Sequence, residues 1–112
     1  MSTPAQWKWA EREVVRVARS RGFLHAERSA AHGSTFAPFD LVGMPGLAVS
    51  VKAHRRKRPE WLAEARAAAE VWSPESRLLP IVVCREWGQP AELWEARIGW
   101  ADLLTLMKEA GY

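Results

Sequence analysis

The sequence predicts a single α/β domain, spanning residues 1–112, in which three helices flank a central mixed five-stranded sheet. Two segments carry apolar residues at the spacing of a helix face, and five shorter apolar runs, bounded by Gly, Pro or polar turns, have the length of strands. The chain contains no repeat, low-complexity segment or linker, and its length is typical of one domain. These observations predict the element order α-β-β-β-α-β-β-α.

The first helix is predicted from Pro4 to about residue 21. Ser2 and Thr3 precede a proline that suits the first helical position, and Gly22 suits the left-handed residue that ends a helix. At 100° per residue one face is apolar and another is basic; the apolar members are Trp7, Val14, Val15 and Ala18, and the basic ones are Arg12, Arg16 and Arg19. Glu11 lies within about 60° of each apolar member, so we expect its carboxylate to face the sheet.

Three strands are predicted next, over residues 23–29, 39–43 and 47–54. The last of these alternates, so that one face carries Leu47, Val49 and Val51 and the other carries Ala48, Ser50, Lys52 and His54. The connecting segments are a loop at 30–35, a tight turn at 44–46 and an exposed basic loop at 55–59.

The second half of the chain predicts a helix, two strands and a closing helix. Pro59 begins the helix, which runs to about residue 72 with an apolar stripe of Trp61, Ala65, Ala68 and Trp72. Glu64 flanks this stripe. After a turn at 73–76, the strands lie within residues 77–87 and at 92–98, and the last helix covers 99–112.

Composition and missing motifs exclude several classes of protein. The net charge of +3 favours polyanionic partners only mildly. No apolar run reaches the ~18 residues of a membrane span, and the first residues do not form a signal peptide, so we expect no membrane association. Cys84 is the only cysteine, which argues against a disulfide framework and fits a cytoplasmic location. Gly-rich phosphate loops, zinc-like histidine spacing and a serine elbow are also absent.

The strand lysine, Lys52, has candidate partners. Asp40 lies on the preceding short strand, and if the two strands pair it comes near Ser50 and Lys52 at one end of the sheet. A buried carboxylate needs a cation, which a lysine or a divalent metal supplies. Glu11 on the inward face of the first helix would close the same pocket. Such an acid–acid–lysine cluster could bind Mg²⁺ through oxygens and waters and act on a phosphate.

Several segments together carry a family resemblance. The stretch AEREVVRVARSRGF (10–23) has the form of a first helix whose metal-site Glu falls on Glu11. ERSAAHGS (27–34) has the form of an Arg-Ser-rich strand and loop, and FDLVG (39–43) that of an Asp-Leu-Val segment. VSVK (49–52) stands at a Glu-x-Lys position, and LLPIVVCREW (78–87) and ELWEARI (92–98) have the form of two further strands. In this order and spacing, the chain resembles the PD-(D/E)xK nuclease superfamily, in particular the archaeal Holliday-junction resolvases and the small phage nucleases related to them.

The resemblance implies a restriction-endonuclease-like fold and a metal-dependent, structure-specific DNA endonuclease that hydrolyses phosphodiester bonds in DNA recombination. Its catalytic residues would be Lys52, Asp40, Glu11 and Ser50. Mg²⁺, or Mn²⁺ in its place, would be held by Asp40, Glu11, Glu64 and the backbone carbonyl of Val51. The partners would be branched DNA, most specifically a four-way junction, and a second copy of the chain in a symmetric homodimer. The location would be cytoplasmic, in the host if the protein is phage-encoded.

One position departs from the family pattern, because Ser50 stands where the family has a Glu two residues before the lysine. Some restriction enzymes of the superfamily have Ser-x-Lys and take the missing acid from the following helix. Glu64, twelve residues after Lys52, matches that position, with Glu60 as the reserve candidate. The Ser50 hydroxyl could also serve a metal-bound water.

Residues around this site are candidates for gripping DNA phosphates. They are Arg28, Ser29, His54, Arg55, Arg56, Lys57 and Arg58. Two other functions stay open: a catalytically inactive DNA-binding module with the same fold, which Ser50 supports, and a small structural or subunit-interaction protein. Junction, flap and linear duplex all stay open as substrates.

Overall fold

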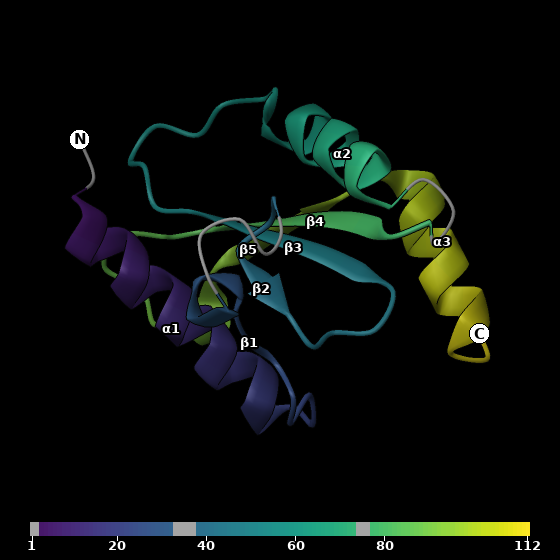
Figure 1. The fold of residues 1–112 in the computed structure, drawn as a ribbon, viewed down its shortest axis with the longest axis horizontal. Coiled ribbons are helices and arrows are strands. Elements are labelled where there is room, and N and C mark those ends of the chain that lie inside the picture. The colour runs from purple at the N-terminus through teal and green to yellow at the C-terminus, as the bar shows by residue number, and fades with distance from the viewer. Residues whose placement is uncertain (1–2, 33–37, 74–76) are drawn as a thin grey trace.

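The computed structural model describes residues 3–32, 38–73 and 77–112, and in them three helices surround a five-stranded sheet (Figure 1). The elements are α1 (Pro4–Ser20), β1 (Glu27–Arg28), the 3₁₀ helix η1 (Ser29–His32), β2 (Leu41–Val42), β3 (Leu47–Lys52), α2 (Trp61–Trp72), β4 (Leu79–Cys84), the 3₁₀ helix η2 (Ala91–Leu93), β5 (Glu95–Ile98) and α3 (Trp100–Glu109). The predicted α/β class and the order of helices and strands are confirmed.

The sheet is mixed, as predicted, with the strand order β1-β2-β3-β4-β5. Only the central pair, β3 and β4, is parallel, in a register that runs from Leu47 opposite Leu79 to Lys52 opposite Cys84. The other three pairs are antiparallel. Because β3 and β4 run the same way, their carboxyl ends meet at one edge of the sheet, where Lys52 lies.

Helix α1 begins with a capping box at Thr3. The Thr3 hydroxyl accepts a hydrogen bond from the Gln6 backbone N–H at 3.2 Å, and the Gln6 side chain accepts one from the Thr3 N–H at 2.9 Å. Pro4 occupies the first helical position, and Gly22, with φ of 104°, follows the helix end. The predicted helix is confirmed to within one residue, while Ser2 lies outside the described residues.

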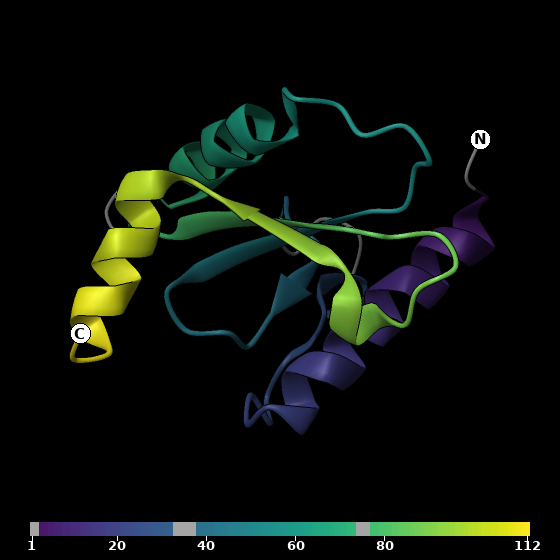
Figure 2. The ribbon, with the colours of Figure 1, turned by 180° about the vertical axis from the view of Figure 1, so that it is seen from behind.

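Alternation along β3 divides the core between the two faces of the sheet. Val49 packs with α1 in a cluster that contains Ala10, Val14, Val15, Leu41, Ala53 and Trp94. Ala48, on the opposite face, packs with Ala69 of α2 and with Phe39. Trp61 of α2 packs on Val82 and Cys84 of β4. The two helices therefore cover opposite faces (Figures 1 and 2).

The first predicted strand, 23–29, is wrong in extent, since only Glu27 and Arg28 pair with β2. The chain turns instead, and the Ala26 N–H donates to the Phe23 carbonyl at 3.1 Å, which an extended strand would not allow. Phe23 and Leu24 are 41% and 73% exposed, so their apolar character did not indicate burial. The 3₁₀ helix η1 covers the start of the predicted loop at 30–35, and residues 33–35 of that loop lie outside the described part.

Other boundaries moved by a few residues. The strand predicted at 39–43 is reduced to β2, and β3 ends at Lys52, so His54 belongs to the following loop. Helix α2 begins at Trp61, two residues after the expected Pro59. Only Ser73 of the turn predicted at 73–76 is described. None of the helices in the described ranges is long and apolar enough to cross a membrane.

Candidate functional site

A cavity of about 220 Å³ lies at the edge of the sheet where β3 ends. Its lining comes from α1, from the residue before β2, and from β3 and the two residues after it: Trp7, Glu11, Asp40, Val51, Lys52, Ala53 and His54. The structure thus brings together five candidate site residues from three separate segments: Glu11, Asp40, Val51, Lys52 and His54. Trp7 lies one helical turn before Glu11 on the same face, a spacing that could have indicated its place in the cavity.

Asp40 is held firmly by backbone hydrogen bonds. Its N–H donates to the Val49 carbonyl at 2.9 Å, and its carboxylate Oδ2 accepts from the Val51 N–H at 2.6 Å. On the other side, its carbonyl accepts from the Ser29 N–H at 2.8 Å, and the Ser29 hydroxyl donates to the Phe39 carbonyl at 2.6 Å. The side chain is thereby held by Val51 of β3, and the backbone of Asp40 is held by Val49 of β3 and by Ser29 of η1.

Ser29 therefore has a different place from the one expected. It is buried, and its hydroxyl is committed to the Phe39 carbonyl. The position of Ser29 therefore does not support the prediction that it contacts the DNA backbone, because its hydroxyl and its N–H are both bonded within the protein. Its contribution is to anchor the segment that presents Asp40.

The environment of Asp40 disfavours its charged form. The pKa of Asp40 is raised to about 6, mainly by burial and also by the charge of the neighbouring Glu11 and a side-chain hydrogen bond with it. The hydrogen bond from the Val51 N–H and the charge of Lys52 act in the opposite direction. Two carboxyl groups in contact in a partly buried cavity share a proton or require a cation.

Glu11 also contacts a cation outside the cavity lining. The Arg28 Nε donates to Glu11 Oε1 at 2.8 Å, and both side chains are less than one-fifth exposed. Arg28, expected at the DNA backbone, is thus attached to the candidate site through a side-chain acid. Glu11 offers its second carboxylate oxygen to other partners.

Lys52 reaches the cavity from the α2 side of the sheet. Its Nζ lies 6.0 Å from the ring centroid of Trp61, a buried side chain of α2. His54 is exposed, and its ring contacts those of Trp7 and Trp61, at centroid distances of 6.3 and 5.9 Å. A lysine ammonium on an aromatic wall is well placed to donate hydrogen bonds to an anion in the cavity.

The acids expected from α2 are not part of this cavity. Glu64 is exposed, and Glu60 forms an ion pair with Arg58 at 2.7 Å. Trp61 and Ala69 mark the buried face of α2, and Glu64 lies about 100° from the midpoint of that face by the helix period. The prediction that Glu64 joins the site is therefore not supported by its position. Ser50 is half-buried and does not line the cavity either.

The basic loop is largely occupied by contacts within the protein. Three of the four cations after His54 have partners, which are the Trp87 ring for Arg55, Glu86 and Glu95 for Lys57, and Glu60 for Arg58. Arg56 is exposed and makes no ion pair with the described residues. Fewer of the basic side chains at 54–58 are therefore available to a phosphate than the sequence alone indicates.

The donor groups of the cavity fit a hard divalent cation. Asp40 and Glu11 supply carboxylate oxygens, Val51 is a third lining residue, and one or two carboxylates with waters are the usual ligands of Mg²⁺. The residues that the structure describes contain no cluster of three or more His, Cys, Asp or Glu arranged for a metal, so carboxylates alone would give a two-acid site. Comparisons with protein-family models, with curated protein sequences and with solved structures find no match to this chain.

Proposed function

We propose that this protein is a metal-dependent, structure-specific DNA endonuclease with a restriction-endonuclease-like fold. One observation carries the proposal: Glu11, Asp40 and Lys52, from three separate segments, line one small cavity at the sheet edge. Two adjacent acids that need a cation, beside an amine, form a combination suited to a phosphodiester. The sequence resemblance to the PD-(D/E)xK superfamily supports the same assignment.

The residues have distinct roles in the proposed reaction. Asp40 and Glu11, with the Val51 carbonyl, would hold Mg²⁺ or Mn²⁺. A bound cation supplies positive charge that stabilises the phosphate in the transition state and lowers the pKa of water. Lys52 donates hydrogen bonds to the attacked phosphate or orients the attacking water. The Val51 N–H keeps the Asp40 carboxylate in one orientation, and the Trp61 ring limits the movement of Lys52.

The four-way junction is the substrate that we propose first, on the strength of the family resemblance. A symmetric homodimer would place two such cavities across the two-fold axis of a junction, so that two strands are cut. Flap and linear duplex DNA are the substrates to compare with it. We propose a cytoplasmic location for the same reason.

Cleavage assays test the nuclease assignment. End-labelled four-way junction, flap and duplex DNA are incubated with the protein in Mg²⁺, in Mn²⁺ and in a chelator. We expect cutting only with a metal, and a fall in rate of at least about 100-fold for Lys52→Ala and Asp40→Asn, the size typical of losing one electrostatic catalytic group. Normal cutting by either variant would rule out the proposed mechanism.

A second function has its own support. Ser50 replaces the acid that the family pattern would place before Lys52, and Glu64 is exposed and does not line the cavity. A DNA-binding module without catalysis would bind junctions with an affinity that falls steeply with salt, and would cut none of the three DNAs with either metal. The same assay separates this module from the nuclease.

A further inference from the structure

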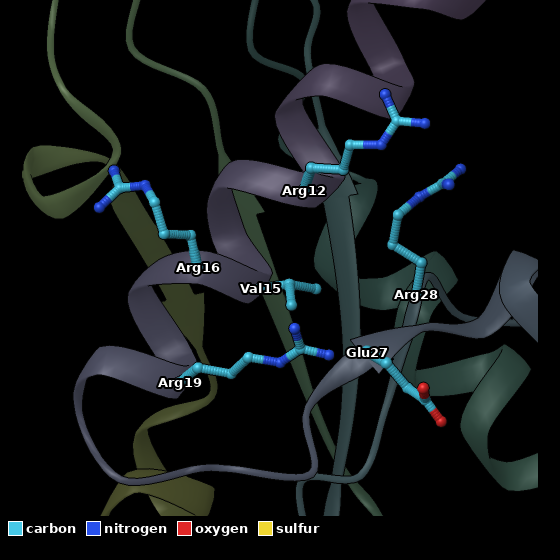
Figure 3. A pocket seen from close by; sticks show the side chains of 6 residues that line it. All are labelled: Arg12, Val15, Arg16, Arg19, Glu27 and Arg28. Atoms are coloured by element: carbon cyan, nitrogen blue, oxygen red, sulfur yellow. The ribbon is translucent and has the colours of Figure 1, made fainter.

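A second cavity, of about 440 Å³, lies along α1 and is lined mainly by arginines (Figure 3). Its lining residues are Arg12, Val15, Arg16, Arg19, Glu27 and Arg28. The volume lies in the range of about 300–1,000 Å³ that is common for ligand sites. A cavity with this charge suits an anion, and arginines are the preferred partners of phosphate groups.

Two of the four arginines bond to neighbouring segments. Arg16 pairs with Glu13 and Glu92, and Figure 3 shows it pointing to the opposite side of α1 from Arg12 and Arg28. The Arg19 Nε donates to the Ala26 carbonyl at 2.8 Å. These contacts tie α1 to the neighbouring segments; Arg16 is paired with two acids, while Arg19 keeps the donors on its Nη atoms.

Arg12 and Arg28 reach the same end of the cavity (Figure 3). Arg12 is exposed and makes no ion pair with residues in the described ranges. Arg28 uses its Nε for Glu11, at 2.8 Å, and a guanidinium has four further N–H donors on its two Nη atoms. The ion pair therefore fixes the orientation of Arg28 without exhausting its donors.

We infer that this cavity binds a backbone phosphate of DNA, with Arg12 and Arg28 as its ligands and with Glu11 positioning Arg28. The inference deepens the proposed function and rests on its DNA substrate. Glu11 lines the first cavity and bonds to an arginine that lines the second, so one carboxylate links the two sites. A DNA strand bound at the arginines would then lie in a defined place relative to Asp40 and Lys52.

Binding without metal separates this positioning role from a role as metal ligand. Fluorescence anisotropy of labelled junction and duplex DNA is measured in a chelator at several salt concentrations. A Glu11 that served only as a metal ligand would repel DNA, so its loss would strengthen binding. A Glu11 that positions Arg28 gives the opposite sign, and we expect Glu11→Ala to bind DNA several-fold more weakly.

Asp40→Ala is the matched control, since it removes an acid from the same cavity that has no bond to Arg28. We expect it to bind DNA as tightly as the wild type or more tightly. Glu11→Gln, which keeps an oxygen for the Arg28 Nε, should fall between Glu11→Ala and the wild type. Thermal unfolding shows which variants are folded. If Glu11→Ala does not fold, Glu11→Gln still tests the inference.

The arginine site itself is tested with Arg12→Ala. Loss of one phosphate contact should weaken binding to all DNA sequences and lower the slope of log affinity against log salt by about one. Lys108→Ala, with the same change of charge on α3, is the control and should have a smaller effect. Inorganic phosphate at matched ionic strength serves as competitor. If Arg12→Ala weakens the binding of phosphate but leaves DNA binding unchanged, the site belongs to free phosphate and our inference is overturned.

The outcomes distinguish this inference from the nuclease assignment. If Glu11→Ala strengthens DNA binding as Asp40→Ala does, the positioning role is wrong, although metal-dependent cutting by the wild type would stand. If the wild type cuts no DNA but Arg12→Ala and Glu11→Ala both weaken binding in chelator, the nuclease is wrong and the phosphate site stands.

Discussion

The two sides of the candidate site differ in how they are built. On the acid side, which consists of Glu11 with α1 and Asp40 with β2, the two carboxylates meet in a partly buried place. On the lysine side, which consists of Lys52, the basic loop and α2, the acid expected from the helix is exposed and most of the cations are paired within the protein. On the acid side Glu11 is paired with Arg28, but the Asp40 carboxyl is incompletely compensated, whereas most cations of the lysine side are paired within the protein.

This difference indicates that the acid side reduces the stability of the fold, as functional sites often do. A carboxyl with a raised pKa in a cavity, next to a second carboxyl, is typical of a functional site and costs stability. The contacts of the lysine side instead fix the loop after β3 and the start of α2. Substitutions on the acid side should therefore change stability as well as activity.

The largest gain in stability should come from Asp40→Asn. The folded-state pKa of Asp40 is about 6, above the 3.8 of the unfolded chain, so the folded state binds more protons between these values. Stability from this group is therefore present below about pH 4 and is lost as the pH rises to about 6. Asparagine keeps an oxygen for the Val51 N–H and stays neutral, so we expect it to stabilise the protein at pH 8 by up to about 3 kcal/mol.

Urea unfolding in a chelator, at pH 8 and pH 4.5, measures this effect. The gain should be large at pH 8 and fall to about one third of that at pH 4.5, where Asp40 is mainly protonated in the folded protein but still mainly ionised in the unfolded chain. Asp102→Asn is the control, since Asp102 is paired with Arg66 at 3.1 Å and its neutralisation should bring no gain. If the wild type is more stable than Asp40→Asn at pH 8, the charged form of Asp40 does not destabilise the fold.

A second prediction concerns the backbone of the acid side. Gly43 follows β2 with φ of 82°, and a Cβ there would lie 1.9 Å from the His25 carbonyl oxygen. Gly46, in the same turn, has φ of 79° with no atom within 4 Å of its Cβ position. Gly46→Ala should cost about 1–2 kcal/mol for the left-handed backbone alone. Gly43→Ala should cost at least about 2 kcal/mol more, because β2 must move away from the segment before β1.

The midpoints of urea unfolding for the two variants measure this difference directly. Equal losses would mean that the approach of Gly43 to residue 25 is not required. A Gly43→Ala protein that folds but has lost metal-dependent cutting would show that the position of Asp40 depends on this contact.

Sequence periods predicted the acid side well. The 3.6-residue period placed Glu11 on the inward face of α1, and the short turn at 43–46 made β2 and β3 neighbours, which brings Asp40 to Val51. Both inferences use only local geometry, since a helix face and a hairpin follow from a few residues. The order of helices and strands followed from the same periods.

The lysine side could not be predicted in this way. Eight residues separate β3 from α2, and the rotation of α2 about its axis is set by how Trp61 and Ala69 pack on the sheet, which no local pattern fixes. The partners of the basic loop include Glu86, two residues after β4, and Glu95 at the start of β5, both far along the chain. The arginine cavity also depends on tertiary packing, because Arg28 meets α1 only when β1 lies against it.

The smallest effect should come from Glu64→Gln, which tests the lysine side. Since the Glu64 carboxylate is exposed and points away from the buried face of α2, we expect metal-dependent cutting at the wild-type rate. Single-turnover rates on the best of the three DNA substrates, at saturating Mg²⁺, measure it. Glu70→Gln is a matched control, being another exposed acid on the same helix.

A different result would revise the picture of α2. A fall of about tenfold or more for Glu64→Gln, equivalent to about 1.4 kcal/mol in the barrier, with Glu70→Gln unaffected, would mean that α2 rotates when DNA and metal bind and brings a third acid to the cavity. The lysine side would then be assembled by the substrate, while the acid side is preformed. If both variants cut normally, Asp40 and Glu11 are sufficient as side-chain ligands, and Ser50 marks a site that works with two acids.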